Sequence, residues 1–226
     1  MIGIIGAMQV EIEGLKKSMT DVSTEVVSGV TFYSGKLAGK DVVAAVSGVG
    51  KVFAAICAEA MILHFHADHL INIGVAGSVT DELKVLDVAL ATAVVQHDMN
   101  TTAIGDPLGL ISGINKVELP ADEQMTKIMS DAMDELGIKH ENGVIASGDL
   151  FVDTPAQRAK IAERFHAIAA EMEGASIGHV CYVNRVPFTI IRSISDAEGS
   201  SMDFATFAEK AAEQSIRIVI KGLERL

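Results

Sequence analysis

The chain opens with MIGIIGAMQVE at residues 1–11, and this stretch decides the class of fold. Ile2–Ile5 is a short apolar run with the length and composition of a buried strand. Residues 10–19 predict a helix, because Ile12, Leu15 and Met19 recur on one helical face. A buried strand that leads directly into an amphipathic helix is the repeating unit of α/β folds.

The same alternation continues to the end of the chain. Further strands are predicted at 31–36, 42–47, 69–73, 88–95, 144–147, 167–170 and 188–194, and helices at 49–65, 121–136, 155–165, 174–184 and 203–226. Residues 105–120 predict a long surface loop, since they hold three glycines and two prolines. This pattern predicts a three-layer α/β fold with a mostly parallel or mixed central sheet flanked by helices. Because no linker or repeat interrupts it, we expect residues 1–226 to form a single domain.

Composition excludes several classes of function. The formal charge of −12 repels nucleic acid and anionic membranes, and it disfavours a highly phosphorylated substrate. No apolar run reaches the roughly 18 residues of a membrane helix. Cys57 and Cys181 lack metal-type spacing and are interpreted as reduced thiols of a cytoplasmic protein. His64, His66 and His69 do not share a helical face, so no metal or other cofactor is predicted.

Acidic residues follow several of the predicted strands. Ligands of open α/β sheets bind beyond the carboxyl ends of the strands, where we expect Glu11, Glu171, Glu173 and Asp196 to gather. Each acid alone has a structural explanation, such as a helix cap or a first-turn acid that complements the helix dipole. Together they suit general acid and base chemistry on a small neutral molecule.

Two glycine-rich stretches do not match nucleotide-binding fingerprints. Residues 3–6 lack the glycine spacing and the downstream acid of a dinucleotide site. In residues 47–51 the terminal Gly-Lys is followed by Val52 instead of the Ser or Thr of a P-loop. Close approach of the backbone to neighbouring atoms or to a ligand explains these glycines better.

Six motifs, in their order along the chain, resemble the 5′-methylthioadenosine/S-adenosylhomocysteine nucleosidases of the purine nucleoside phosphorylase/nucleosidase superfamily. The motifs are GIIGAM at 3–8 followed by Glu11, SGVGK at 47–51, residues 72–77, SGD at 147–149 with Phe151, EME at 171–173, and ISD at 194–196. The resemblance implies a hydrolase of N-glycosidic bonds that releases adenine and a 5′-substituted ribose. Methylthioadenosine, S-adenosylhomocysteine, 5′-deoxyadenosine and aminodeoxyfutalosine all remain open as substrates.

The resemblance also implies residue roles. Glu11 would activate the attacking water, Asp196 would protonate N7 of adenine, and Glu173 would bind the ribose 2′ and 3′ hydroxyls. Phe151 would stack on adenine and the Val152 backbone would hydrogen-bond to it. The implied supporting residues are Gly77 for close backbone approach, Met172 against the sugar, Arg192 and Ser195 in the polar network, and Met8, Val49, Phe204 and a partner subunit's Ile104 around the 5′ substituent.

Two alternatives stay open. One is a phosphate-dependent purine nucleoside phosphorylase; it is disfavoured because no arginine precedes Arg158 and because Glu11 would repel phosphate. The other is a non-catalytic nucleoside-binding protein, which would need neither Glu11 nor Asp196. The apolar stretch 104–111 and the resemblance predict a homodimer. The resemblance further implies a cytoplasmic enzyme of methionine salvage.

Overall fold

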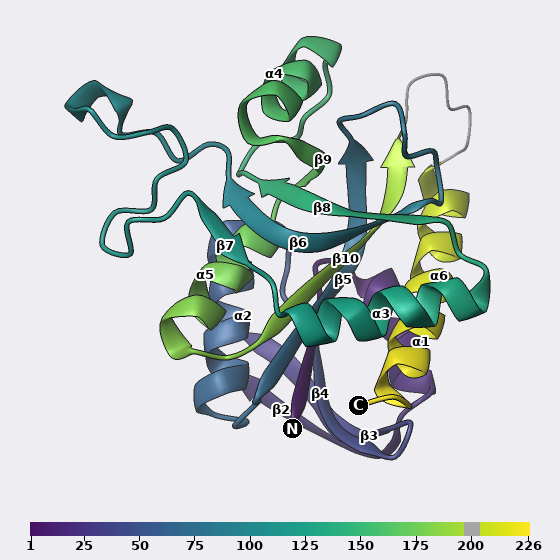
Figure 1. Cartoon of the computed structure of the whole chain (residues 1–226). Helices are drawn as coiled ribbons and strands as arrows, with labels where there is room; N and C mark the ends of the chain where they lie inside the picture. The colour runs from purple at the N-terminus through teal and green to yellow at the C-terminus, as the bar shows by residue number, and fades with distance from the viewer. Residues whose placement is uncertain (197–203) are drawn as a thin grey trace.

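The computed structural model describes residues 1–196 and 204–226, apart from the side chains of residues 196, 204–206 and 208. A twisted sheet lies between helices on both faces (Figure 1). The strands are β1 (Ile2–Gly6), β2 (Thr20–Val27), β3 (Val30–Leu37), β4 (Lys40–Val46), β5 (His69–Ser78), β6 (Val88–Gln96), β7 (Glu118–Pro120), β8 (His140–Ser147), β9 (Ala167–Glu171) and β10 (Phe188–Asp196). The helices are α1 (Gln9–Lys17), α2 (Lys51–Leu63), η1 (Thr102–Ile104), α3 (Glu123–Leu136), α4 (Pro155–Phe165), α5 (Gly174–Asn184) and α6 (Phe204–Leu223).

The sheet is mixed. Its strand order is β10-β6-β8-β9-β5-β1-β4-β3-β2, with β7 added beside β6. Because β10 also pairs with β5, the strands β5, β10, β6, β8 and β9 close into a ring. β1 lies in parallel between β4 and β5, whereas β2, β3 and β4 form an antiparallel extension. The carboxyl ends of β5, β9 and β10 meet at Gly77, which pairs with Ala170 and Asp196, so strand ends converge at one edge of the closed region.

The three layers have separate apolar cores. On one face, α2 and α5 bury Ala54, Cys57, Ile177 and Cys181. On the other face, α1, α3 and α6 bury a second aliphatic and methionine-rich set, which includes Met129. The helix α4 packs over β8 and β9 at the end of the sheet where the strands converge. This arrangement confirms the predicted three-layer α/β class.

The structure corrects several element boundaries. β2 was not predicted at all, because it is an exposed edge strand held by its antiparallel pairing with β3. β5 was predicted to end at Ile73, yet it runs to Ser78 because β9 and β10 pair with its glycine-rich end. The predicted loop 105–120 contains the short strand β7 at its end. α3 ends at Leu136, as predicted, and Gly137 follows it in the left-handed region (φ 66°).

Candidate active site

A cavity of about 190 Å³ opens where the strands converge. Its walls come from the ends of β1, β5, β9 and β10 and from the loops that follow β4 and β8. The lining residues are Ala7, Met8, Glu11, Val49, Val75, Ala76, Gly77, Leu150, Phe151, Val152, Ala170, Glu171, Met172, Glu173, Arg192 and Ser195. Aliphatic and methionine side chains dominate this wall, and the polar groups gather on one side of it.

Glu11 is a buried acid on the polar side of the cavity, in the first turn of α1. Its Oε2 accepts hydrogen bonds from the backbone N–H groups of Ala7 (2.7 Å) and Met8 (2.9 Å). Its Oε1 is buried and makes no hydrogen bond within the described residues. Burial raises the pKa of Glu11, while Arg192 and the backbone N–H groups of Met8, Ala7 and Val75 oppose the rise. One oxygen is therefore fixed by the helix start, and the other is available to a ligand.

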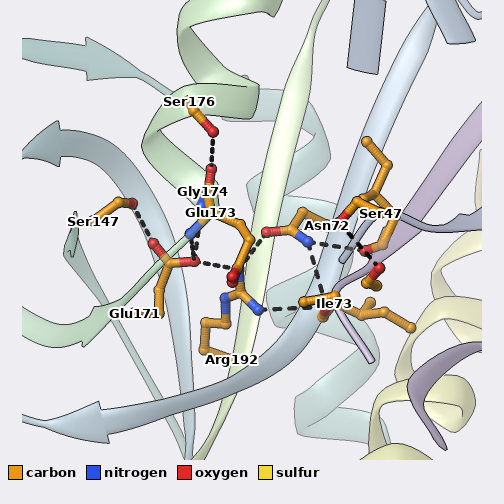
Figure 2. Close-up of polar contacts among 12 residues, drawn as sticks. Ser47, Asn72, Ile73, Ser147, Glu171, Glu173, Gly174, Ser176 and Arg192 are labelled. Atoms are coloured by element: carbon orange, nitrogen blue, oxygen red, sulfur yellow. Dashed lines mark hydrogen bonds and ion pairs between the residues drawn. The ribbon is translucent and has the colours of Figure 1, made fainter. Parts of the chain in front are cut away.

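Arg192 is the centre of a buried polar network (Figure 2). Its Nη2 donates to Asn72 Oδ1 at 2.6 Å and pairs with Glu173 Oε2 at 3.3 Å and with Glu171. Glycine is required at position 74, because a Cβ there would collide with Nη1 of Arg192 and would lie 3.1 Å from Oε1 of Glu11. The guanidinium thus lies beside all three carboxylates of the cavity.

Glu171 anchors the network to the start of α5. Its Oε2 accepts the backbone N–H groups of Glu173 (3.0 Å) and Gly174 (2.8 Å), and its Oε1 accepts the hydroxyl of Ser147. The Ser147 hydroxyl oxygen in turn accepts the Ala175 N–H at 2.7 Å. Both oxygens of this carboxylate accept hydrogen bonds from protein groups, so Glu171 orients its neighbours.

Glu173 is another buried acid that lines the cavity. Its Oε1 accepts the backbone N–H of Gly50 at 2.9 Å, and its Oε2 faces Arg192. Burial, opposed by Arg192 and reinforced by Glu171, raises the pKa of Glu173 to about 7. A carboxyl group that titrates near neutral pH in a cavity is typical of functional sites.

The structure brings most of the predicted site residues together. Around the one cavity lie Met8, Glu11, Val49, Gly77, Phe151, Val152, Met172, Glu173, Arg192 and Ser195. Asp196 ends β10 beside Ser195, but its side chain and that of Phe204 lie outside the described residues. Ile104 is 80% exposed on η1, in the arm between β6 and β7 that extends away from the sheet in Figure 1.

The sequence analysis did not identify the residues that hold the cavity's charged side chains in place. Asn72, Ser147 and Glu171 were assigned no role, although they hold Arg192 and the start of α5. Ser147 and Glu171 end β8 and β9, a position that indicates a place near the ligand, whereas Asn72 lies inside β5 and gives no such signal. Among the described residues, no cluster of His, Cys, Asp or Glu is arranged to hold a metal ion. None of the described helices is long and apolar enough to cross a bilayer.

Comparison with known proteins agrees with this fold and cavity. Residues 1–224 match the profile of the Phosphorylase superfamily, so the chain is a member of that class. It is 39% identical to the 5′-methylthioadenosine/S-adenosylhomocysteine nucleosidase of Shewanella sediminis, with 100% of this chain and 99% of the relative covered. It is 38% identical to the aminodeoxyfutalosine nucleosidase of Campylobacter jejuni, with the same coverage.

A solved structure narrows the class further. The crystal structure of the Campylobacter jejuni 5′-methylthioadenosine/S-adenosylhomocysteine nucleosidase superposes with a TM-score of 0.95 at 38% identity, covering 100% of this chain and 99% of the other. Within the superfamily, the chain belongs to the 5′-methylthioadenosine/S-adenosylhomocysteine nucleosidase family.

Proposed function

We propose that this chain hydrolyses the N-glycosidic bond of 5′-methylthioadenosine and S-adenosylhomocysteine, and of 5′-deoxyadenosine, releasing adenine and the 5′-substituted ribose. The observation that carries the proposal is Glu11, a buried acid in the cavity with one oxygen held by backbone N–H groups and the other unpaired among the described residues. The names of the relatives support the same chemistry.

The proposed reaction divides acid and base work between two carboxyl groups. Asp196 protonates N7, so that adenine leaves as a neutral molecule. Glu11 takes a proton from water as the water attacks C1′ of the sugar. Arg192 and the Ala7 and Met8 N–H groups favour the ionised form that a base needs, against the effect of burial.

The sugar carries positive charge in an oxocarbenium-like transition state. Glu173 is assigned to bind the ribose 2′ and 3′ hydroxyls, and its negative charge is then close to C1′. That attraction is stronger in the transition state than in the ground state, so it accelerates the reaction. Met172 packs against the sugar, and Phe151 and Val152 hold adenine.

The charges in the cavity favour water over phosphate as the nucleophile. Among the described lining residues Arg192 is the single cation, and its guanidinium is already paired with Glu171 and Glu173. Phosphate would have to lie beside Glu11 without a cation to neutralise it. These observations support a hydrolase over a phosphorylase.

The 5′ substituent of the substrate is assigned to the apolar rim formed by Met8, Val49, Phe204 and the Ile104 of a second copy. The proposed homodimer has an apolar surface to use: Val52, Phe53 and Leu63 of α2 and Val183 of α5 are each more than half exposed. The same helices line an open groove that includes Ile56 and Val180.

We assign the enzyme to methionine salvage in the cytoplasm.

The test is adenine release from methylthioadenosine with and without added phosphate. Equal release in both conditions is expected for the hydrolase. Release only with phosphate would show that the chain is a phosphorylase and that Glu11 does not activate water. Binding of adenine nucleosides without release would identify a nucleoside-binding protein, and a series of 5′ substituents, aminodeoxyfutalosine included, would rank the substrates.

A further inference from the structure

The loop after β8 carries residues that line the cavity but has little packing of its own. Leu150 is 47% exposed and Phe151 is 72% exposed. An exposed loop with few buried apolar contacts opens at low free energy unless polar contacts hold it. Since Phe151 and Val152 are the residues assigned to adenine, what holds this loop affects how well adenine is oriented.

Polar contacts at the start of the loop form a closed ring with Lys51 and Asp98. The Asp149 carboxylate accepts the backbone N–H of Lys51, at the start of α2, at 2.8 Å. The Lys51 ammonium pairs with Asp98 Oδ1 at 2.7 Å. The other oxygen of Asp98 accepts the backbone N–H of Asp149 at 2.9 Å. Each member of the ring therefore holds the other two.

The ring is partly shielded from water. The side chains of Lys51 and Asp98 are 18% and 27% exposed, and the ammonium also donates to Gln96 Oε1 at 3.3 Å. A charged pair supported by two backbone N–H groups and a neutral acceptor restricts geometry more than an isolated surface pair does.

The ring also reaches the sugar side of the cavity. Gly50 precedes Lys51 in the chain, and its N–H donates to Glu173 Oε1. Gly50 has a φ of 101°, and a Cβ there would lie 3.1 Å from Asp149 Oδ1. Asp149 thus fixes the backbone turn that presents the Gly50 N–H to Glu173.

We propose that Lys51, Asp98 and Asp149 are positioning residues: their ring holds the adenine loop (residues 148–152) against the start of α2 and, through Gly50, orients Glu173. The inference rests on the proposed function for its kinetic readouts. None of the three side chains is assigned a contact with the substrate. Their loss weakens the orientation of adenine and sugar without removing an acid or a base.

The decisive comparison is between Asp149→Ala and Asp149→Asn. Asparagine keeps an oxygen for the Lys51 N–H, whereas alanine removes it. For Asp149→Ala we expect adenine affinity to fall about tenfold and KM to rise by a similar factor, with a smaller fall in kcat through Glu173. We expect Asp149→Asn to remain within about threefold of wild type. Asp98→Ala should resemble Asp149→Ala, and the double variant should be little worse than either, since one ring is broken in each case.

The control is Asp41→Ala, which removes a Lys–Asp pair of similar length (2.8 Å to Lys36) on the β3–β4 hairpin. It should leave adenine affinity and KM unchanged. Additive losses in the double variant, or equal losses in Asp149→Asn and Asp149→Ala, would overturn the proposal. The proposal would also be overturned if the losses of adenine affinity disappeared at high protein concentration, because such losses would reflect weaker subunit association.

Amide hydrogen exchange separates this inference from the proposed function, since it needs no turnover. In Asp149→Ala and Asp98→Ala, the amides of residues 50–51 and 149–152 should exchange faster, while those of β1 and β5 stay protected. Unchanged exchange of the loop would refute the ring even in an active enzyme. Faster exchange in a protein that releases no adenine would support the ring and refute the function.

Discussion

Among its described residues, the cavity holds one positively charged group, the guanidinium of Arg192, beside three carboxyl groups. This excess of acidic groups affects the chemistry of individual residues in the cavity. Glu171 and Glu173 pair with it directly, and Glu11 lies across Gly74 from it. If all three acids were ionised, the buried cluster would carry excess negative charge, which burial opposes. The raised pKa of Glu173 is the result, and in the proposed reaction a positively charged sugar would favour the ionised carboxylate and lower this pKa.

Glu173 provides a pH-dependent test of that balance. Its pKa rises from 4.5 to about 7 on folding, so the folded state holds an additional proton between these values. Its contribution to stability is therefore present at low pH and is lost as the pH rises from about 4.5 through about 7. We expect Glu173→Gln to raise Tm relative to wild type by more at pH 8 than at pH 5, while turnover falls. A difference in Tm that is the same at both pH values would contradict this explanation.

In the proposed reaction, hydrolysis depends on Glu11. Glu11→Gln keeps the shape of the side chain and an acceptor for the Ala7 and Met8 N–H groups, but it cannot take a proton from water. We expect kcat to fall by more than roughly 10²-fold with nucleoside affinity retained. Adenine release and equilibrium binding measure the two effects separately. Glu13→Gln, an exposed acid on the same helix, serves as the matched control, and full activity of Glu11→Gln would remove Glu11 as the base.

The part of the site that depends on local sequence patterns could be predicted. Glu11 and Glu173 follow predicted strands, so they were expected at one edge of the sheet, whereas Arg192 was implied by the family resemblance; all three line one cavity. The contacts that hold them join residues far apart in the chain, such as Asn72 to Arg192 and Gly50 to Glu173. Such pairs depend on strand order and register, which no local pattern specifies.

At the scale of elements, the prediction succeeded where local signals are strong. The bounds of α4 and α5 agree with the predicted ranges; α4 has proline at its first turn and a Thr154 cap. The sequence analysis missed β2 because the side chains of this strand are exposed, so its sequence lacks the apolar alternation of a half-buried strand. The closed ring of β5, β10, β6, β8 and β9 depends on pairings between distant segments and was likewise beyond the sequence.

The start of α3 gives a test of element stability away from the cavity. The Asp122 side chain accepts the Met125 N–H at 2.8 Å and caps the helix that buries Met129. Asp122→Ala should cost about 1 kcal/mol, which lowers Tm by roughly 2–4 °C for a domain of this size. Asp122→Asn should cost much less because asparagine also caps well, and kcat should be unchanged in both. Thermal unfolding measures the loss, and equal loss in the two variants would argue against the cap.

At the scale of the whole molecule, the proposed homodimer makes a direct prediction. Val52 is 68% exposed on the apolar surface of α2, where a buried charge in an interface would be costly. Wild type should sediment at twice the chain mass of 23.8 kDa, and Val52→Glu should sediment as a monomer with much reduced activity. Val22→Glu, at an exposed valine of β2, is the control and should remain dimeric. A wild-type monomer that is fully active would refute the dimer and the role of Ile104.

The single-domain proposal is tested by calorimetry. The closed ring of strands joins β5 in the first half of the chain to β6, β8, β9 and β10, which extend into the second half, so neither half keeps its core alone. We expect one cooperative unfolding transition for each subunit, with a calorimetric enthalpy equal to the van't Hoff enthalpy once association is included. Two separable transitions would divide the chain into independent units.

The arm between β6 and β7 affects how this enzyme can change over generations. Ile104 is exposed on its own subunit, so a substitution there leaves the sheet, the two cores and the acids of its own cavity untouched. In the proposed dimer the same substitution alters the 5′ rim of the neighbouring cavity. Mutations at this position can thus broaden or narrow the range of accepted nucleosides at almost no cost in folding, which leaves the arm free to diverge as organisms acquire different uses for one reaction.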